Sequence, residues 1–189
     1  MKIGILKERK NPPDRRVVLS PKKCAELLKT YPQLEIKVES SDSRFFSDNG
    51  YKKEGVQVFE DVSDCDILLG VKEVPIENLI PNKKYFFFSH TIKKQKYNRD
   101  LLKAILAKNI ELYDHETITD KNNMRLVAFG IYAGIVGAYN AFRTYGLKFN
   151  LFNLPKGEEL HDKKMLIEEL KKLKLPPIKV VLTGKGRVG

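Results

Sequence analysis

The sequence predicts an α/β protein with a doubly wound parallel sheet, and three observations support this prediction. Short apolar runs alternate with amphipathic stretches from the N-terminus onward. Two of these runs, Cys65–Val71 and Tyr85–Ser89, are almost continuously apolar, as strands buried on both faces are. The short spacing between the runs is typical of right-handed βαβ units, in which a helix connects two parallel strands.

The first part of the expected sheet begins with a strand at Ile3–Leu6. Ser20 followed by Pro21 is the pattern of a helix N-cap with proline at the first helical position, so we expect a helix to begin there. The alternating pattern of Leu34–Val38 predicts a second strand. A short helix is expected over Asp48–Gly55, where the glycine ends it.

The second part of the sheet is expected from the two apolar runs and the elements that follow them. Leucine and isoleucine at helical spacing predict a helix over about Lys94–Lys108. Ile110–Tyr113 predicts another strand. The alternation of strand and helix therefore continues to this point of the chain.

Three glycines lie within a long apolar helix that we expect from Leu126 to about Tyr145. A glycine inside a helix costs roughly 1 kcal/mol relative to alanine, so close packing or a ligand is needed to explain them. Tight contact between helices is the simpler explanation. The glycines are Gly130, Gly134 and Gly137.

The last part of the chain has the pattern of a dinucleotide-binding turn. A loop over Phe149–Glu159 and a basic helix over about Asp162–Leu173 precede a hydrophobic strand, Ile178–Thr183. That strand leads into GKGRVG, a G-x-G-x-x-G sequence in which glycines permit a tight turn and close approach to a pyrophosphate. An ordinary turn between strand and helix, or a glycine-rich tail, is the alternative. The glycines of the turn are Gly184, Gly186 and Gly189.

The position of this turn at the end of the sequence limits the nucleotide binding that we expect. The sequence stops at Gly189, before the helix and before the acidic residue that a ribose contact would place about 20 positions later. We therefore expect a fragment that binds a nucleotide poorly or not at all and is inactive in isolation.

Composition argues against several classes of protein. With 189 residues, 42% of them hydrophobic, the chain has room for one large domain, or for one domain and part of a second. No apolar run approaches the roughly 20 residues of a membrane-spanning helix, and the N-terminus turns charged too early for a secretory signal. Two cysteines and three histidines predict neither a disulfide framework nor a metal site, and the expected location is the cytoplasm.

The net charge is +11, from 35 Lys and Arg against 24 Asp and Glu. The basic residues are spread along the chain and mostly mixed with acidic ones, and no nucleic-acid-binding motif is present. We therefore expect no nucleic-acid partner. Attraction for anionic metabolites or a nucleotide is the milder interpretation of the charge.

Polar side chains at the ends of the buried strands are candidate site residues, because ligands of open α/β sheets bind beyond the carboxyl ends of the strands. Lys72 and Glu73 follow the first apolar run, and His90 follows the second. A lysine beside a hydrophobic strand can exchange a proton or hold a carboxylate, and histidine titrates near neutrality. Each residue alone is also typical of a solvated loop. Together they predict a shared site.

Two more charged residues are candidates for the same edge of the sheet. Arg15 or Arg16, after the loop that follows the first strand, can clamp a substrate carboxylate with two hydrogen bonds; a surface arginine is the alternative. Glu116 follows a predicted strand and can adjust the protonation of Lys72 or His90, or merely balance local basic charge. We expect its neighbour His115 to be structural or solvated.

Seven segments occur in the order found in one known superfamily: MKIGILKE, RRVVLSP, DILLGVKEVP, FFFSHTIKKQ, ELYDHETITD, RLVAFGIYAGIVGA and VVLTGKGRVG. Over essentially its whole length the chain resembles alanine dehydrogenases, pyridine-nucleotide transhydrogenases and lysine-forming saccharopine dehydrogenases. The middle is most similar to the lysine–2-oxoglutarate reductase (saccharopine-forming) branch. FFFSHTIKKQ and R-x-VAFG-x-x-AG are the most specific segments, whereas GKGRVG is less glycine-rich than the turn of typical alanine dehydrogenases.

The resemblance implies a role for each matching residue. Lys72 and His90 match the family's proposed acid–base pair, and Arg16 matches the arginine that holds a substrate carboxylate. Glu73 and Glu116 match acidic residues that adjust the protonation of the pair. The resemblance also places Arg125 within reach of the substrate, and it assigns the cofactor turn to Gly184, Gly186 and Gly189.

The resemblance further implies a flavodoxin-like substrate domain over 1–125, a long linking helix over 126–147 and the truncated start of a Rossmann domain over 148–189. The implied cofactor is NAD or NADP, and the implied substrates are an amino acid and a 2-oxo acid. The expected function is the N-terminal part of an NAD(P)-dependent oxidoreductase acting on CH–NH groups, of the saccharopine dehydrogenase type. An alanine dehydrogenase using pyruvate and ammonia, and a non-catalytic metabolite-sensing module, are the alternatives.

Overall fold

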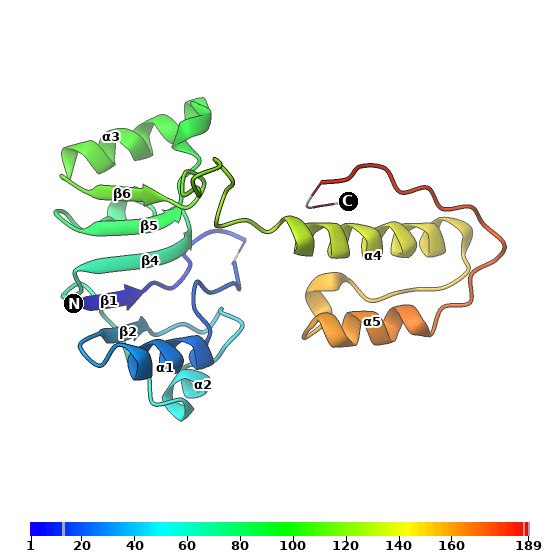
Figure 1. The fold of residues 1–189 in the computed structure, drawn as a ribbon, viewed down its shortest axis with the longest axis horizontal. Helices are drawn as coiled ribbons and strands as arrows, with labels where there is room; N and C mark the ends of the chain where they lie inside the picture. The colour runs from blue at the N-terminus through cyan, green and yellow to red at the C-terminus, as the bar shows by residue number, and fades with distance from the viewer. Residues whose placement is uncertain (13, 187, 189) are drawn as a thin grey trace. The chain divides into compact units, whose positions relative to one another are not determined.

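Six parallel strands form the sheet of the first of two units into which the chain divides (Figure 1). The computed structural model describes residues 1–12, 14–186 and 188. The first unit spans Met1–Val127 and the second spans Ala128–Gly189. The separate linking helix over 126–147, and the boundaries of the three expected segments, stay predictions.

The strands pair in the order β3-β2-β1-β4-β5-β6, and every pair is parallel. This confirms the predicted α/β class. Without the short edge strand β3, the order is the flavodoxin-like one, with two directions of winding that separate at β1 and β4. The strands are β1 (Lys2–Ile5), β2 (Glu35–Glu39), β3 (Gln57–Phe59), β4 (Ile67–Lys72), β5 (Lys84–Phe88) and β6 (Glu111–Asp114).

Helices cover both faces of this sheet. Ile5 packs in one core cluster with Cys24 of α1 and Tyr51 of α2. The neighbouring Gly4 instead approaches Leu68, which packs with α3 in the other cluster. Because successive residues of a strand face opposite sides, the two clusters lie on opposite faces of the sheet. The helices are α1 (Pro21–Thr30), α2 (Asp48–Lys53) and α3 (Arg99–Ala107), with short 3-10 turns η1 (Ile76–Asn78), η2 (Thr91–Lys93) and η3 (Lys96–Asn98).

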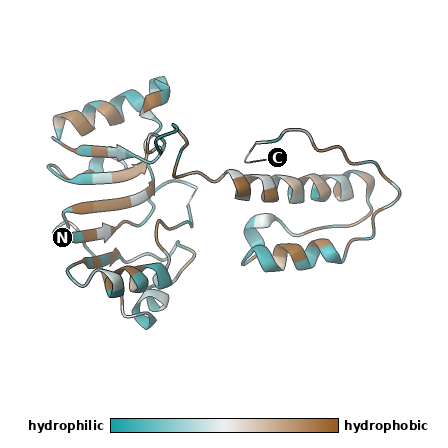
Figure 2. Ribbon diagram, viewed as in Figure 1, coloured by the Kyte–Doolittle hydropathy of each residue, from teal (hydrophilic) through white to brown (hydrophobic). Residues whose placement is uncertain are grey.

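The local signals for the first helix and the central strand are confirmed. Ser20 caps α1 by accepting a hydrogen bond from the backbone N–H of Lys23, and Pro21 is the first helical residue. Strand β4 is hydrophobic over most of its length, as its position in the middle of a sheet covered on both faces requires (Figure 2). Strand β3 was not predicted, because three residues are too few for a periodic pattern.

Two predicted helices begin later than expected. The helix predicted from about Lys94 begins at Arg99, because η2 and η3 occupy the residues before it. The helix predicted from Leu126 is α4 (Gly130–Phe149). Leu126 instead donates its N–H to the Ile118 carbonyl at 2.9 Å, next to an isolated antiparallel bridge, so this stretch cannot be helical.

The second unit packs α4 against α5 (Lys163–Lys171), with the 3-10 turn η4 (Gly157–Glu159) between them. The predicted strand at Ile178–Thr183 is wrong: these residues lie outside any strand, and no strand occurs among the described residues of this unit. A strand exists only through hydrogen bonds to a neighbouring strand, which the apolar pattern alone does not supply.

Two of the glycines that the sequence indicated in α4, Gly134 and Gly137, differ in their packing. A Cβ added at Gly137 would meet nothing within 4 Å among the described residues, whereas one at Gly134 would lie 2.2 Å from the Val188 carbonyl oxygen. The tightest side-chain packing is at Gly146, where an added Cβ would lie 2.4 Å from the Phe152 ring. Gly146 therefore allows the chain after α4 to fold back onto the helix.

We expect Gly146→Ala to lower the free energy of unfolding by about 1–3 kcal/mol, the usual cost of overpacking a closely packed position. Urea unfolding followed by circular dichroism measures this change. Gly137→Ala is the matched control in the same helix, and it should raise stability by about 1 kcal/mol through helix propensity. Equal effects of the two substitutions would contradict the packing at Phe152.

Candidate active site

Two groups of polar side chains lie at the carboxyl ends of the strands of the first unit, where ligands of open α/β sheets bind. The first, which we call the β1/β4 group, follows the strands at which the winding direction changes. The second, the β5/β6 group, follows the next two strands. The β1/β4 group is Glu8, Asp14, Arg16, Lys72 and Glu73, and the β5/β6 group is His90, Lys93, Glu116 and Arg125.

Glu8 ties the end of β4 to the loop after β1. Its Oε1 accepts a hydrogen bond from the backbone N–H of Val71 at 2.7 Å, and its Oε2 accepts one from Lys72 at 2.9 Å. Burial raises the pKa of Glu8 above its usual value, against the lowering effect of these two hydrogen bonds. The carboxylate therefore fixes the backbone from which the Lys72 side chain extends.

Glu39, at the end of β2, holds the same loop from its other side. Its side chain is 6% exposed; it pairs with Arg9 and accepts a hydrogen bond from the Lys7 N–H at 3.0 Å. Neither Glu8 nor Glu39 was a candidate from sequence, although both are acidic residues at or just after a predicted strand. A search for acidic residues at the ends of strands would have found them.

Arg16 faces an acidic residue of its own loop. Its Nε donates to Asp14 Oδ1 at 2.9 Å and its Nη2 pairs with the other carboxylate oxygen. Hydrogen bonding from Arg16 outweighs burial and lowers the pKa of Asp14. The Arg16 side chain is 44% exposed, so a carboxylate from solution can reach it. Asp14 orients the guanidinium from within the same loop.

Lys72 has no side-chain hydrogen bond or ion pair within the described residues. Its charge nonetheless helps to lower the pKa of both Asp14 and Glu73, which places the ammonium group near these carboxylates. Glu73 accepts a hydrogen bond from Lys10 Nζ at 2.6 Å on one oxygen, and its other oxygen is buried without a hydrogen-bond partner among the described residues. Burial opposes ionisation of Glu73, but the hydrogen bonds from Lys10 and from the Glu73 backbone N–H, together with the charges of Lys10 and Lys72, outweigh it and lower the pKa of Glu73.

Glu116 is the centre of the β5/β6 group. Its Oε2 lies 3.1 Å from His90 Nδ1, and its Oε1 lies 3.2 Å from Lys93 Nζ and 3.5 Å from Arg125 Nη1. The Glu116 side chain is only 13% exposed. Burial works against its ionisation, but hydrogen bonds from His90 and Lys93 outweigh burial and lower the pKa of Glu116. Three basic side chains thus surround one carboxylate.

The turns after β5 and β6 present His90 and Glu116 to each other. His90 adopts a left-handed backbone conformation, with φ of 57°, which turns the chain away from the strand direction. Asp114 pairs with the buried Ser89 hydroxyl and also accepts the Glu116 N–H at 2.8 Å. One carboxylate therefore links the two turns.

His115 joins the β5/β6 group to strand β4. Its Nε2 donates to the Gly70 carbonyl at 3.1 Å, and its ring centroid lies 5.2 Å from that of Phe88. Phe88 is also the register partner of Lys72, and its ring lies 6.2 Å from the ring of His90. Lys72 and His90 make no direct hydrogen bond in the described part of the chain, but they lie on neighbouring strands at one edge. As expected, His115 is structural.

We expect acid to destabilise the fold through His115. Burial lowers the pKa of His115 from its ordinary value of 6.5. Above pH 6.5 the imidazole is neutral in both states, whereas at lower pH the unfolded chain binds a proton that the folded chain does not. Stability therefore falls from about pH 6.5 down through the folded-state pKa, by about 1.4 kcal/mol for each unit of pKa difference.

The free energy of unfolding, obtained from urea unfolding at several pH values between 8 and 5, is the measurement. His115→Leu should remove this part of the pH dependence, and His161→Gln, in the second unit, should keep it. An identical slope for wild type and His115→Leu would contradict the assignment.

The predicted cofactor turn is described only in part. Gly184 has φ of +98°, a conformation that glycine adopts readily, and an added Cβ at Gly186 would meet nothing within 4 Å. Gly189 lies outside the described residues. No paired strand precedes the turn among the described residues, so the structure supports the turn conformation at Gly184 but not the strand before it. Among the described residues, no three His, Cys, Asp or Glu side chains are grouped to hold a metal.

The sequence model of the alanine dehydrogenase/PNT N-terminal domain matches residues 4–136. This range begins within β1 and includes the other five strands and both polar groups. The chain belongs to this family. The recognition from sequence is thereby confirmed, and so is the dehydrogenase-type relationship. Lys72 and His90, at the carboxyl edge of the sheet, lie within the region that matches the family model.

The similar proteins in this family are larger. An alpha-aminoadipic semialdehyde synthase of Arabidopsis thaliana is 40% identical over 76% of this chain and 14% of its own length. The lysine-forming, NAD(+)-linked saccharopine dehydrogenase of Yarrowia lipolytica is 29% identical over 97% of this chain and 54% of its own length. The chain thus spans less than two thirds of either relative.

A solved structure supports the fold independently. The transhydrogenase from Sinorhizobium meliloti matches with a TM-score of 0.60 at 16% identity, over 77% of this chain and 44% of that one. At this identity, the likeness shows the α/β fold alone. The predicted doubly wound parallel sheet is confirmed.

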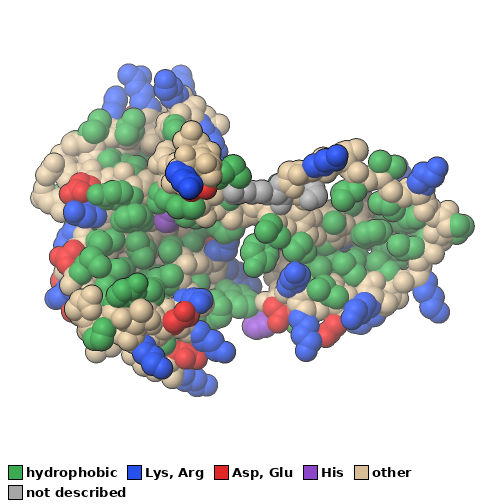
Figure 3. All heavy atoms as spheres, in the orientation of Figure 1, with side chains coloured by type: hydrophobic (Ala, Val, Ile, Leu, Met, Phe, Trp, Pro, Cys, Tyr) green, Lys and Arg blue, Asp and Glu red, His purple; other side chains and the backbone are tan. Residues whose placement is uncertain are grey.

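None of the described helices combines the length and apolar character that crossing a membrane requires. On the face of the first unit shown in Figure 3, acidic side chains lie among the basic ones. The absence of a nucleic-acid partner and the cytoplasmic location stay predictions.

Proposed function

We propose that this chain is the substrate domain of an NAD(P)-dependent oxidoreductase that forms saccharopine from lysine and 2-oxoglutarate. The observation that supports it best is the His90–Glu116 pair at the same carboxyl edge as Lys72, in a sheet of the alanine dehydrogenase/PNT family. The similarity to a lysine-forming saccharopine dehydrogenase favours lysine chemistry over that of alanine.

In this proposal, the ε-amine of lysine adds to the keto carbon of 2-oxoglutarate, and the resulting carbinolamine loses water to give an imine. His90 and Lys72 move the protons: one accepts a proton from the attacking amine, and the other donates one to the departing hydroxyl. Arg16 holds a substrate carboxylate, and Arg125, 41% exposed beside Glu116, is positioned to hold another. NAD or NADP, when bound, supplies the hydride that reduces the imine carbon.

Glu116 acts through its neighbours. It orients the His90 ring through Nδ1 and so leaves Nε2 available for proton transfer. Lys93 shares the same carboxylate and reaches His90 Nδ1 at 3.2 Å. The charge of Glu116 therefore balances a cationic cluster and determines which nitrogen of His90 meets the substrate. Glu73 has the corresponding position beside Lys72, where Lys10 holds it.

The test of the proposal is turnover by the full-length protein that contains this chain. Oxidation of NADH or NADPH in the presence of lysine and 2-oxoglutarate, with saccharopine as product, is the expected result. Turnover with pyruvate and ammonia alone would assign an alanine dehydrogenase. Binding of these metabolites without turnover in either assay would assign a sensing module.

We expect Glu116→Gln to lower kcat by about tenfold. The amide keeps the size of the side chain, but it removes the negative charge that pairs with His90, Lys93 and Arg125. Steady-state kinetics with lysine and 2-oxoglutarate measure this effect. Glu111→Gln, at the exposed start of β6, is the matched control. An unchanged kcat in Glu116→Gln would mean that Glu116 only balances basic charge.

A further inference from the structure

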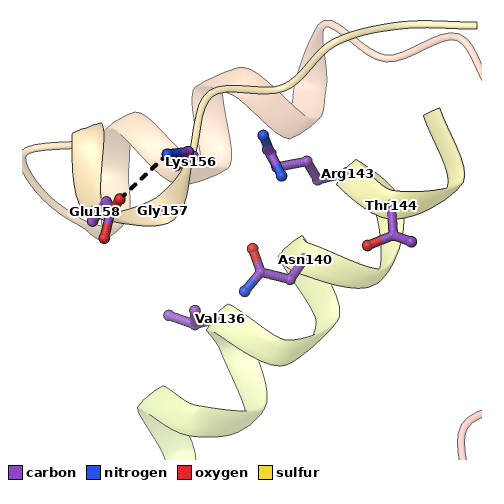
Figure 4. Close-up of a pocket in the computed structure, with 7 residues that line it drawn as sticks. All are labelled: Val136, Asn140, Arg143, Thr144, Lys156, Gly157 and Glu158. Atoms are coloured by element: carbon purple, nitrogen blue, oxygen red, sulfur yellow. Dashed lines mark ion pairs between the residues drawn. The ribbon is translucent and has the colours of Figure 1, made fainter. Parts of the chain in front are cut away.

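A pocket of about 540 Å³ lies within the second unit, between one face of α4 and the segment that contains η4 (Figure 4). Helical spacing places three polar residues of α4 on the face toward this pocket. The opposite wall comes from the start of η4. The polar lining residues are Asn140, Arg143 and Thr144 on α4, and Lys156 and Glu158 on the facing segment.

The walls of the pocket are fixed to each other by buried contacts. The hydroxyl of Tyr139, a fully buried side chain, donates to the Pro155 carbonyl at 2.8 Å. Arg143 Nε donates to the Leu154 carbonyl at 3.0 Å. Leu154 itself is buried with Leu166 of α5 in the core of this unit. The space is therefore built between two anchored segments of the unit.

Arg143 is held in a way that leaves its outer nitrogens for a ligand. The bond to Leu154 uses only Nε, and Figure 4 shows the guanidinium extending from α4 toward the segment that carries Lys156. The two Nη groups can then donate in parallel to one oxyanion. Asn140 and Thr144 add neutral donors from the same helix face.

The acidic lining residue does not cancel this charge. Glu158 lies 3.8 Å from Lys156, and the two side chains are 78% and 59% exposed. An ion pair this long and this exposed contributes little free energy, so an incoming anion can displace Glu158 from Lys156. The pocket therefore presents two cations, Arg143 and Lys156, to a ligand.

We propose that this pocket binds a small metabolite through an oxyanion group, a carboxylate or a phosphate. Arginine and lysine facing each other across a polar space recognise such groups, and the volume is in the range of small-molecule sites. None of the described residues that line it is aromatic, so no aromatic ring is available there to stack on a nucleobase. The site goes beyond the proposed function, because it uses none of the residues at the edge of the sheet.

The test is an NMR titration of the 189-residue chain with inorganic phosphate and, separately, with succinate, at constant ionic strength. The amide of Gly157, in the pocket wall, is the reporter. We expect saturable shifts at Gly157 with at least one anion. Arg143→Gln should weaken binding at least tenfold and Lys156→Gln about threefold. Lys148→Gln, near the end of α4 and outside the lining, should leave binding unchanged.

Tighter binding of phosphate than of succinate would identify a phosphate ester as the ligand, and the reverse would identify a carboxylate. Absence of saturable shifts at Gly157 with both anions would overturn the proposal, as would equal binding by wild type and Lys156→Gln. The exposed Lys156 side chain is not part of the wall contacts, so this variant keeps the test valid if Arg143→Gln alters the fold. Failure here would leave the saccharopine-forming proposal untouched, since that is measured by turnover.

Discussion

Lys72→Met should lower kcat/KM of the full-length enzyme by a factor of about 10²–10⁴, the contribution of a positioned acid–base group. Methionine keeps the length and much of the shape of lysine, but it can neither hold nor transfer a proton. The backbone of residue 72 should not move, because Glu8 binds its N–H and not its side chain. The loss should therefore appear in catalysis, with the free energy of unfolding unchanged. Nucleotide oxidation with lysine and 2-oxoglutarate is the measurement.

Lys53→Met, at the exposed end of α2, is the matched control and should keep full activity. His90→Gln should also lower turnover at least tenfold, because it removes the second proton-transfer group. If each of Lys72→Met and His90→Gln changes turnover by less than tenfold, the assignment of the acid–base pair is wrong. Activity then depends on other groups at this edge.

The edge of the sheet was predictable because two simple patterns converge on it. Apolar runs identify buried strands, and in a parallel sheet the residues after such runs lie on one side. This reasoning placed Lys72 and His90 at one edge, and the register of Lys72 with Phe88 agrees with it. It also placed Glu116 there, and the structure adds the direct contact with His90.

The contacts that hold this edge were not predictable from those patterns. Glu8 binds backbone N–H groups more than sixty residues away, and no local periodicity reports a partner at that distance. His115 is similar, since its bond to Gly70 depends on how β4 and β6 flank β5. The hydrogen-bond partners of such residues depend on the assembled fold and not on the segment in which the residues lie.

The error at Ile178–Thr183 has the opposite cause. Its apolar pattern is as strong as that of the true strands, but a β-strand is defined by hydrogen bonds to a neighbour. In the first unit each run finds a partner, whereas the described residues of the second unit provide none. Hydrophobicity therefore predicts which residues can be strand, and the presence of a neighbour decides whether they are.

Glu8→Ala should have the largest effect on stability among the site residues, lowering the free energy of unfolding by about 2–4 kcal/mol. The substitution removes the acceptor of two part-buried backbone N–H groups, at Val71 and Lys72, and each unsatisfied donor costs about 1–3 kcal/mol. Because those N–H groups belong to the last two residues of β4, their amides should also exchange faster with solvent. Urea unfolding and hydrogen exchange measure the two effects.

Glu60→Ala, an exposed carboxylate just after β3, is the matched control and should change stability by less than about 0.5 kcal/mol. The two measurements together separate a positioning role from mere charge balance. A loss of charge alone would change stability without faster exchange at Val71 and Lys72, and that outcome would contradict the role of Glu8. Faster exchange confined to these two amides would instead show that Glu8, in the loop after β1, positions the backbone of Lys72. The loop after β1 would then contribute to the proposed chemistry through the placement of Lys72.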